Sequence, residues 1–154
     1  MAAIEKFAPT GFAGDVTRPD VSTVESIYID GATETPTAFG VPVYVEAGKA
    51  RTVADSYGGT IYGVLTRSVP SIAASSAEPD APAADFAQGV LVEGYVLVKV
   101  GSGTPVRGAR AYIRSGLFVA DNTGPNDIET SAVWAADGKD GNDIAELFFT
   151  RLVV

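Results

Sequence analysis

Glycine and proline interrupt this chain so often that long helices are disfavoured throughout it. Seventeen glycines and nine prolines are spread over 154 residues, and the short runs between them are rich in Val, Ile, Tyr, Phe and Thr. Such runs between turn residues are typical of β-strands, and no stretch repeats apolar residues at helical spacing over a helical length. The sequence therefore predicts an all-β fold, an antiparallel β-barrel or β-sandwich with an extended N-terminal arm.

The chain has the length of a single domain. Residues 1–22 show no periodicity and contain four Pro or Gly residues, so we expect an extended arm followed by one β domain over residues 23–154. Residues 68–85 are rich in Ser, Ala and Pro and predict a long surface loop. The strands expected in the β domain are 26–30, 40–46, 49–54, 60–67, 90–100, 107–115, 117–120, 131–136 and 144–154.

Three local features refine these strands. Ala47-Gly48 predicts a tight turn, and Gly63 predicts a bulge or a close approach of another backbone. In the run 107–115, alternation would place Ala109, Ala111 and Ile113 on one face and Arg110, Tyr112 and Arg114 on the other. Small residues facing inward at period two suit a curved barrel wall.

The chain contains neither histidine nor cysteine. Histidine is the side chain that titrates between about pH 5 and 8 and the commonest metal ligand, and cysteine supplies thiolate nucleophiles and soft metal ligands. Ser-His-Asp and Cys-His catalysis, zinc–thiolate centres and disulfides are therefore impossible. We expect a protein that binds or builds rather than an enzyme, with no cofactor and no metal.

The formal net charge is −8, from 19 acidic and 11 basic residues. Phosphate binding requires clustered Lys and Arg, so we expect no nucleic-acid partner. The start of the chain has no basic segment followed by an apolar one, which predicts no signal peptide. Apolar stretches fall far short of the ~20 residues that span a bilayer. We therefore expect synthesis in a cytoplasm and no membrane association.

Two groups of acidic residues suggest other functions. The loop Asp137–Asp143 has a composition seen in calcium sites, but an EF-hand counted from Asp137 would place Lys139 and Phe148 at ligand positions. We interpret the loop as a solvated turn. Glycosidase chemistry would need two carboxylates about 5–9 Å apart, and the candidates for such a pair are Asp85, Glu93, Asp127, Glu129 and Glu146.

The candidate partner-binding residues are aromatic and basic. Phe7 and Phe12 lie in the arm, as does Arg18, and the main basic concentration is Arg107, Arg110 and Arg114. The three arginines fit a solvated strand face paired with cross-strand carboxylates, or alternatively a contact with an acidic partner.

Several phrases of the sequence resemble the structural cement, or decoration, proteins of tailed bacteriophages. They are FGVPVYVEAGKARTV, GGTIYGVLTRSVP, GYVLVKVGSGTPVRGARAYIR and AADGKDGNDIAELFF, together with the arm segment GFAGDVTRPD. The resemblance covers nearly the whole chain and is weakest in residues 68–85. It rests on the succession of strand and turn segments in the sequence. It implies a protein that binds the major capsid protein on the outer surface of an expanded capsid and stabilises the shell against internal DNA pressure.

The resemblance also implies a symmetric oligomer. Tyr95, Tyr112 and Trp134 lie on strands whose outward faces are not obviously polar, and an exposed apolar patch favours assembly. We expect a homotrimer on the capsid, with a homodimer as the alternative, and an arm that adds a strand to a shell subunit. The other classes left open are a tail or fibre module and a carbohydrate-binding β-sandwich that would stack sugars on Trp134.

Overall fold

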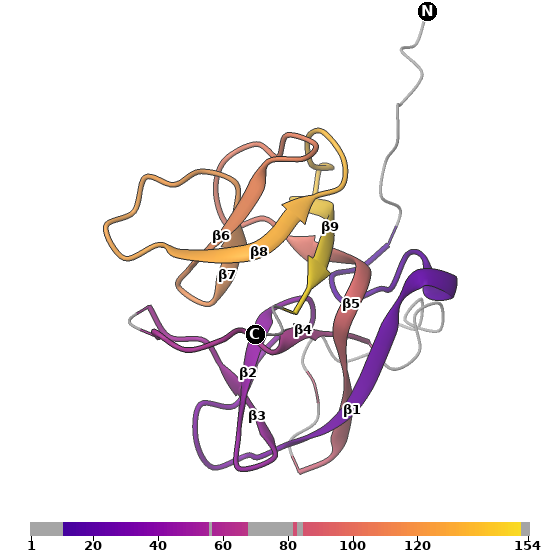
Figure 1. The fold of residues 1–154 in the computed structure, drawn as a ribbon, viewed down its shortest axis with the longest axis vertical. Coiled ribbons are helices and arrows are strands. Elements are labelled where there is room, and N and C mark those ends of the chain that lie inside the picture. The colour runs from indigo at the N-terminus through magenta and orange to yellow at the C-terminus, as the bar shows by residue number, and fades with distance from the viewer. Residues whose placement is uncertain (1–10, 56, 68–81, 83–84, 152–154) are drawn as a thin grey trace, which may run out of the picture.

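The computed structural model describes residues 11–55, 57–67, 82 and 85–151, and nearly all of the regular structure within them is β-sheet (Figure 1). The exception is η1 (Pro19–Val21), a single 3₁₀ turn that the sequence analysis did not predict. Proline at its first position suits this turn because proline lacks the N–H that would go unpaired there. The strands are β1 (Thr23–Ile29), β2 (Pro42–Glu46), β3 (Lys49–Thr52), β4 (Gly63–Leu65), β5 (Ala87–Lys99), β6 (Arg110–Arg114), β7 (Leu117–Val119), β8 (Ile128–Trp134) and β9 (Ile144–Thr150).

Five strands close into a barrel, which confirms the barrel alternative. Their order is β1-β3-β2-β4-β5, and β5 pairs back onto β1 with Tyr28 opposite Ala87 and Val24 opposite Leu91. The closing pairs are antiparallel, as expected, except that β1 and β3 run parallel where Ile29 lies opposite Ala50. Closure removes the open sheet edges that would otherwise pair with other chains.

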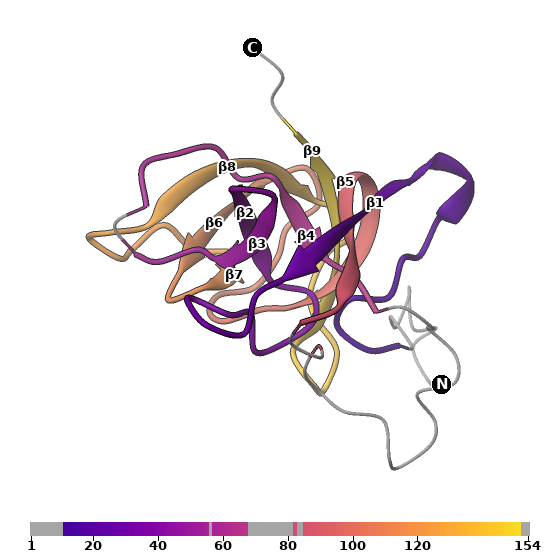
Figure 2. The ribbon, with the colours of Figure 1, turned by 90° about the horizontal axis from the view of Figure 1, so that it is seen from below.

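Strand β5 joins the barrel to the rest of the molecule. Its residues 87–93 pair with β1 and β4 and form part of the barrel wall, and its residues 93–99 pair with β9. The sheet continues from β9 through β8 and β6 to β7. Figure 2 shows β6 and β8 of this second part together on one side of β5. The two parts therefore share one strand that runs through both.

Two local predictions are confirmed at the barrel. Ala47 and Gly48 both have positive φ, 52° and 78°, and join β2 to β3 as a two-residue hairpin, the geometry that matches strand twist. A Cβ on Gly63 would lie 2.3 Å from the carbonyl oxygen of Leu91. Glycine is therefore required at Gly63 by the close approach of β4 to β5.

The core lies mainly between β5, β9, β8 and β6 and contains Phe118, Trp134 and Phe149. Trp134 is only 1% exposed, so its ring is not at the surface as the carbohydrate-binding alternative would require. Ala111 and Ile113 are buried as the alternation predicted, but Ala109 is exposed because it belongs to the turn preceding β6. Among the described residues, no helix has the length and apolar character needed to cross a membrane.

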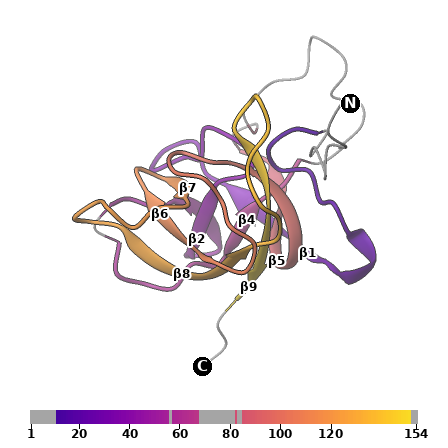
Figure 3. The same cartoon turned by 90° about the horizontal axis from the view of Figure 1, so that it is seen from above.

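The described part of the arm pairs with the edge of β5 that does not pair with β9. Val16 forms an antiparallel bridge with Val96, Gly14 N donates to the Leu97 carbonyl at 2.7 Å, and Leu97 N donates to the Asp15 carbonyl at 2.9 Å. Figure 3 shows this segment beside β5 before it turns through η1 into β1. Residues 14–17 of the arm thus already pair with β5 within the chain. Residues 1–10 and most of the loop 68–85 lie outside the described residues.

Candidate partner-binding surface

Phe12 is the arm aromatic that the structure describes, and Phe7 lies outside the described residues. The Phe12 side chain is 49% exposed, although its backbone N–H donates to the Asp15 carboxylate at 3.0 Å. Holding a large apolar ring at the surface is unfavourable in water unless a partner covers it. The structure therefore keeps Phe12 as a candidate contact residue.

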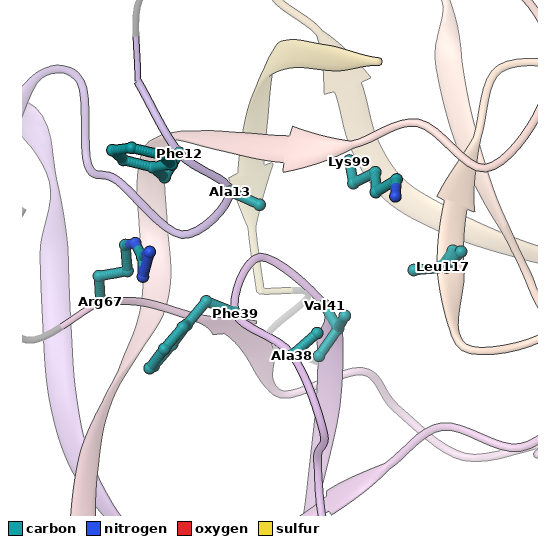
Figure 4. A pocket seen from close by; sticks show the side chains of 8 residues that line it. All are labelled: Phe12, Ala13, Ala38, Phe39, Val41, Arg67, Lys99 and Leu117. Atoms are coloured by element: carbon teal, nitrogen blue, oxygen red, sulfur yellow. The ribbon is translucent and has the colours of Figure 1, made fainter. Parts of the chain in front are cut away.

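Beside Phe12 lies a pocket of about 280 Å³ (Figure 4). Segments far apart in the sequence meet there. They are the arm, the loop before β2, the segment just after β4, the end of β5 and the start of β7. The lining is largely apolar and carries two cationic side chains. The lining residues are Phe12, Ala13, Ala38, Phe39, Val41, Arg67, Lys99 and Leu117.

Arg67 is the most constrained charged residue of this pocket. Its side chain is 4% exposed, and its guanidinium carbon lies 5.0 Å from the ring centroids of both Phe12 and Phe39. Its nearest carboxylate is Asp15, with Nε 3.9 Å from Oδ1, too far for a hydrogen bond. Nε and Nη1 of Arg67 and Oδ1 of Asp15 have no hydrogen-bond partner among the described residues. Buried polar groups in this state are uncommon.

Sequence reasoning did not find this pocket. Arg67 was expected only as the end of a strand, and nothing in the sequence indicates that it meets Phe39 or Lys99. Their meeting follows from barrel closure and from the docking of the arm, since Arg67 N donates to the Gly14 carbonyl at 3.0 Å.

Arg18 is held against the outer face of β5 and β9. Its guanidinium carbon lies 3.9 Å from the Tyr95 ring centroid, and Nη2 is 3.0 Å from Oε1 of Glu146. Thr17 Oγ1 donates to Oε2 of the same carboxylate at 2.5 Å. Tyr95 in turn packs on Phe148 with ring centroids 5.0 Å apart. Half of the Arg18 side chain remains exposed, so it can contact a partner while anchoring the arm.

The three arginines that cluster in the sequence, Arg107, Arg110 and Arg114, differ in their surroundings. Arg110 pairs with Glu129 across β6 and β8, and both side chains are exposed. Arg114 donates from Nε and Nη2 to the two carboxylate oxygens of Asp127, each at 2.7 Å. Arg107 is exposed, and its backbone N–H donates to Asp137 at 2.8 Å. The cross-strand pairing expected for a solvated face therefore holds for Arg110 and Glu129.

The Arg114 cluster fastens the loop between β7 and β8. Asp127, whose side chain is 1% exposed, also accepts from Gly124 N at 2.8 Å, and Asp121 lies 3.3 Å from Arg114. The bonds from Arg114 hold the pKa of Asp127 below its ordinary value, and a bond from Thr123 does the same for the pKa of Asp121. These carboxylates raise the pKa of Arg114. Arg114 therefore contributes to the fold, because its Nε and Nη2 donate to groups within the chain.

The three carboxylates of the loop Asp137–Asp143 are engaged within the chain, and that of Asp140 accepts hydrogen bonds from the backbone of its own loop and of the residue after it. Asp140 accepts from Asn142 N at 2.8 Å and from Ile144 N at 2.9 Å, and Lys139 pairs with Asp143 at 3.0 Å. This is the hydrogen bonding expected of an Asx-type turn. In the part of the chain that the structure describes, no three acidic residues gather as a potential metal site.

Four of the five candidate glycosidase carboxylates are engaged by different partners. Asp85 accepts from Tyr28, Asp127 binds Arg114, Glu129 binds Arg110, and Glu146 binds Thr17 and Arg18. Glu93 is exposed at the middle of β5. The four engaged carboxylates therefore belong to four separate sets of ion pairs and hydrogen bonds.

The barrel and its sheet extension define a small all-β barrel protein. The family model described as "Structural cement protein (E217 gp24/Pam3 gp6)" matches residues 3–150, and the chain belongs to that family. Among solved structures, the chain is similar to one in a structure described as "The capsid of Myoviridae Phage XM1", at 15% sequence identity and a TM-score of 0.72. That match covers 99% of this chain and 97% of the other, and it shows the shared fold. A search of curated proteins found no match.

Proposed function

We propose that this protein is a capsid cement protein of a tailed bacteriophage, which binds the outer surface of the expanded shell and stabilises it against internal DNA pressure. The observation that carries the proposal is the family match over residues 3–150. The structural similarity to a chain from a phage capsid, over nearly the full length of both chains, supports it through the shared fold. A non-enzymatic role agrees with the absence of histidine and cysteine from the sequence.

The surface of the described chain is suited to protein contacts. Several large apolar side chains are exposed to solvent. Covering such side chains in a complex supplies most of the favourable free energy of association. Burying one phenylalanine fully contributes about 1.5–3 kcal/mol. In addition to Phe12, these exposed side chains are Val21, Val24, Tyr28, Phe86 and Val106.

In this proposal the arm, with Phe7, Phe12 and Arg18, faces the shell together with the exposed arginines Arg107 and Arg110. Arg114 contributes to this surface indirectly. Its Nε and Nη2 donate to Asp127 and thereby fix the loop before β8. The partner is the major capsid protein, and no nucleic acid or membrane is involved. Modest affinity at each of many sites on the shell is sufficient because the contacts act together on one lattice.

We further propose that the protein assembles as a homotrimer on the shell, with a homodimer as the alternative. Closed cyclic contacts suit the three-fold and two-fold axes of a capsid lattice. The exposed apolar side chains named above are available for such contacts.

The proposal is tested by sedimenting the purified protein with expanded and with unexpanded shells that lack it. We expect saturable binding to expanded shells, weak binding to unexpanded ones, and shells that resist heating better once decorated. Equal absence of binding to both shell forms, or recovery of the protein only with isolated tails, would overturn it. The latter result would favour a tail or fibre module.

A further inference from the structure

We infer that the pocket between Phe12, Phe39 and Lys99 is the recognition site for an acidic side chain, flanked by an apolar one, on the shell protein. This inference rests on the proposed function and adds to it the chemistry of the partner segment. It concerns described residues far apart in the sequence that the fold brings together.

Arg67 has hydrogen-bond donors that the described chain does not use. A guanidinium carries five N–H donors in a planar fork that matches a carboxylate. At Arg67 two of the nitrogens are buried without a hydrogen bond among the described residues, and the nearest carboxylate oxygen stands 3.9 Å away on Asp15. A carboxylate that enters the pocket beside Arg67 would be attracted to this under-paired charge in a site with little water, where charged interactions are strong.

The pocket also carries an excess of positive charge. Lys99 ends β5 at the rim of the pocket, its side chain is exposed, and none of the ion pairs between described residues includes it. Arg67 and Lys99 therefore place two positive charges against the single negative charge of Asp15, in a chain whose net charge is −8. This local excess of positive charge is complementary to an acidic segment and repels a basic one.

The wall around these charges is mostly apolar. Ala13, Phe39, Val41 and Leu117 make up much of it, and Figure 4 shows the Arg67 guanidinium placed between Phe12 and Phe39. A volume of about 280 Å³ lies just below the roughly 300–1,000 Å³ of pockets that enclose a drug-sized ligand. It suits one or two side chains of a peptide. Free inorganic phosphate would leave the apolar wall uncovered, so an acidic residue beside an apolar one is the better fit.

The test compares binding of wild-type protein and three variants to expanded shells that lack this protein. Lys99→Glu reverses the charge at the rim, Lys99→Arg conserves it, and Lys49→Glu makes the same change of charge at a 41% exposed lysine on β3 outside the pocket lining. We expect Lys99→Glu to weaken binding at least about tenfold, and the other two variants to stay within about threefold of wild type. Circular dichroism and thermal unfolding verify that all four proteins are folded.

A second measurement identifies the occupant. Zero-length carbodiimide coupling of decorated shells joins a lysine amine to a carboxylate in contact with it, and mass spectrometry locates the link. We expect Lys99 linked to a glutamate or aspartate of the shell protein. Unchanged binding by Lys99→Glu, links from Lys99 only to a second copy of this chain, or no link from Lys99 would overturn the inference. If wild-type protein fails to bind shells at all, the proposed function itself is wrong, so the two failures are distinguishable.

Discussion

Replacing Gly63 by alanine tests the close contact on which barrel closure depends. A Cβ at this position would lie 2.3 Å from the carbonyl oxygen of Leu91 and 2.6 Å from Cγ1 of Val90. A valine methyl can rotate away, but the backbone oxygen cannot, so β4 must move away from β5. That movement would strain the register pairs Val64 with Leu91 and Leu65 with Val90.

The expected cost lies at the upper end of the usual range for overpacking. Added methyl groups in a packed core cost about 1–3 kcal/mol, and here the added carbon meets backbone on a three-residue strand. We therefore expect Gly63→Ala to lower the free energy of unfolding by about 3 kcal/mol. For a domain of this length that corresponds to a decrease in Tm of about 6–12 °C.

Urea and thermal unfolding followed by circular dichroism measure this loss, with Gly141→Ala as the matched control. A Cβ on Gly141 would meet nothing within 4 Å, and Gly141 lies outside the left-handed region. The control should change the free energy of unfolding by less than about 0.5 kcal/mol. A Gly63→Ala protein as stable as the Gly141→Ala control would refute the close approach of β4 to β5.

Three further predictions follow from the described side chains. Asp127→Asn should lower the free energy of unfolding at pH 7. This loss relative to wild type should shrink as pH falls below about 4, because the pKa of Asp127 is lowered in the folded state and its stabilising effect disappears as the carboxylate protonates. Urea unfolding at several pH values measures the loss, and a loss that does not change with pH would contradict the prediction. Trp134 is the only tryptophan and is buried, so iodide should quench its fluorescence little in the native protein and strongly after unfolding; strong native quenching would place the ring outside the core. Because Asp140 binds its own loop backbone, EDTA should leave the Tm unchanged within about 1 °C, and a large decrease would reveal a metal site.

Local signals were sufficient for much of the barrel. The Ala47-Gly48 turn and the constraint at Gly63 were predictable because each depends on a few neighbouring residues and on the backbone freedom of glycine. The boundaries were less predictable. Strand β1 begins at Thr23 rather than Ser26 because Thr23 lies opposite Glu93, and β8 begins at Ile128 rather than Ser131 because Ile128 lies opposite Ile113.

The long-range features were not predictable from the sequence. Docking of the arm depends on hydrogen bonds between the backbones of residues 14–17 and 95–97, which carry no side-chain signature. The interior position of Trp134 depends on which face of β8 meets the core, and the 3₁₀ turn at Pro19–Val21 depends on the junction of the arm with β1. The pocket at Arg67 depends on barrel closure and on the docking of the arm, so its residues show no common pattern in the sequence.

A reconstruction by electron cryo-microscopy of expanded shells decorated with this protein tests the proposed cement role most directly. We predict density for the barrel and its sheet extension on the outer surface of the shell, in copies that touch one another around symmetry axes. Phe12 and Lys99 should lie at the contact with the shell protein. Density inside the shell, density confined to the tail, isolated copies without contact between neighbours, or contact with the shell through the opposite face would contradict it.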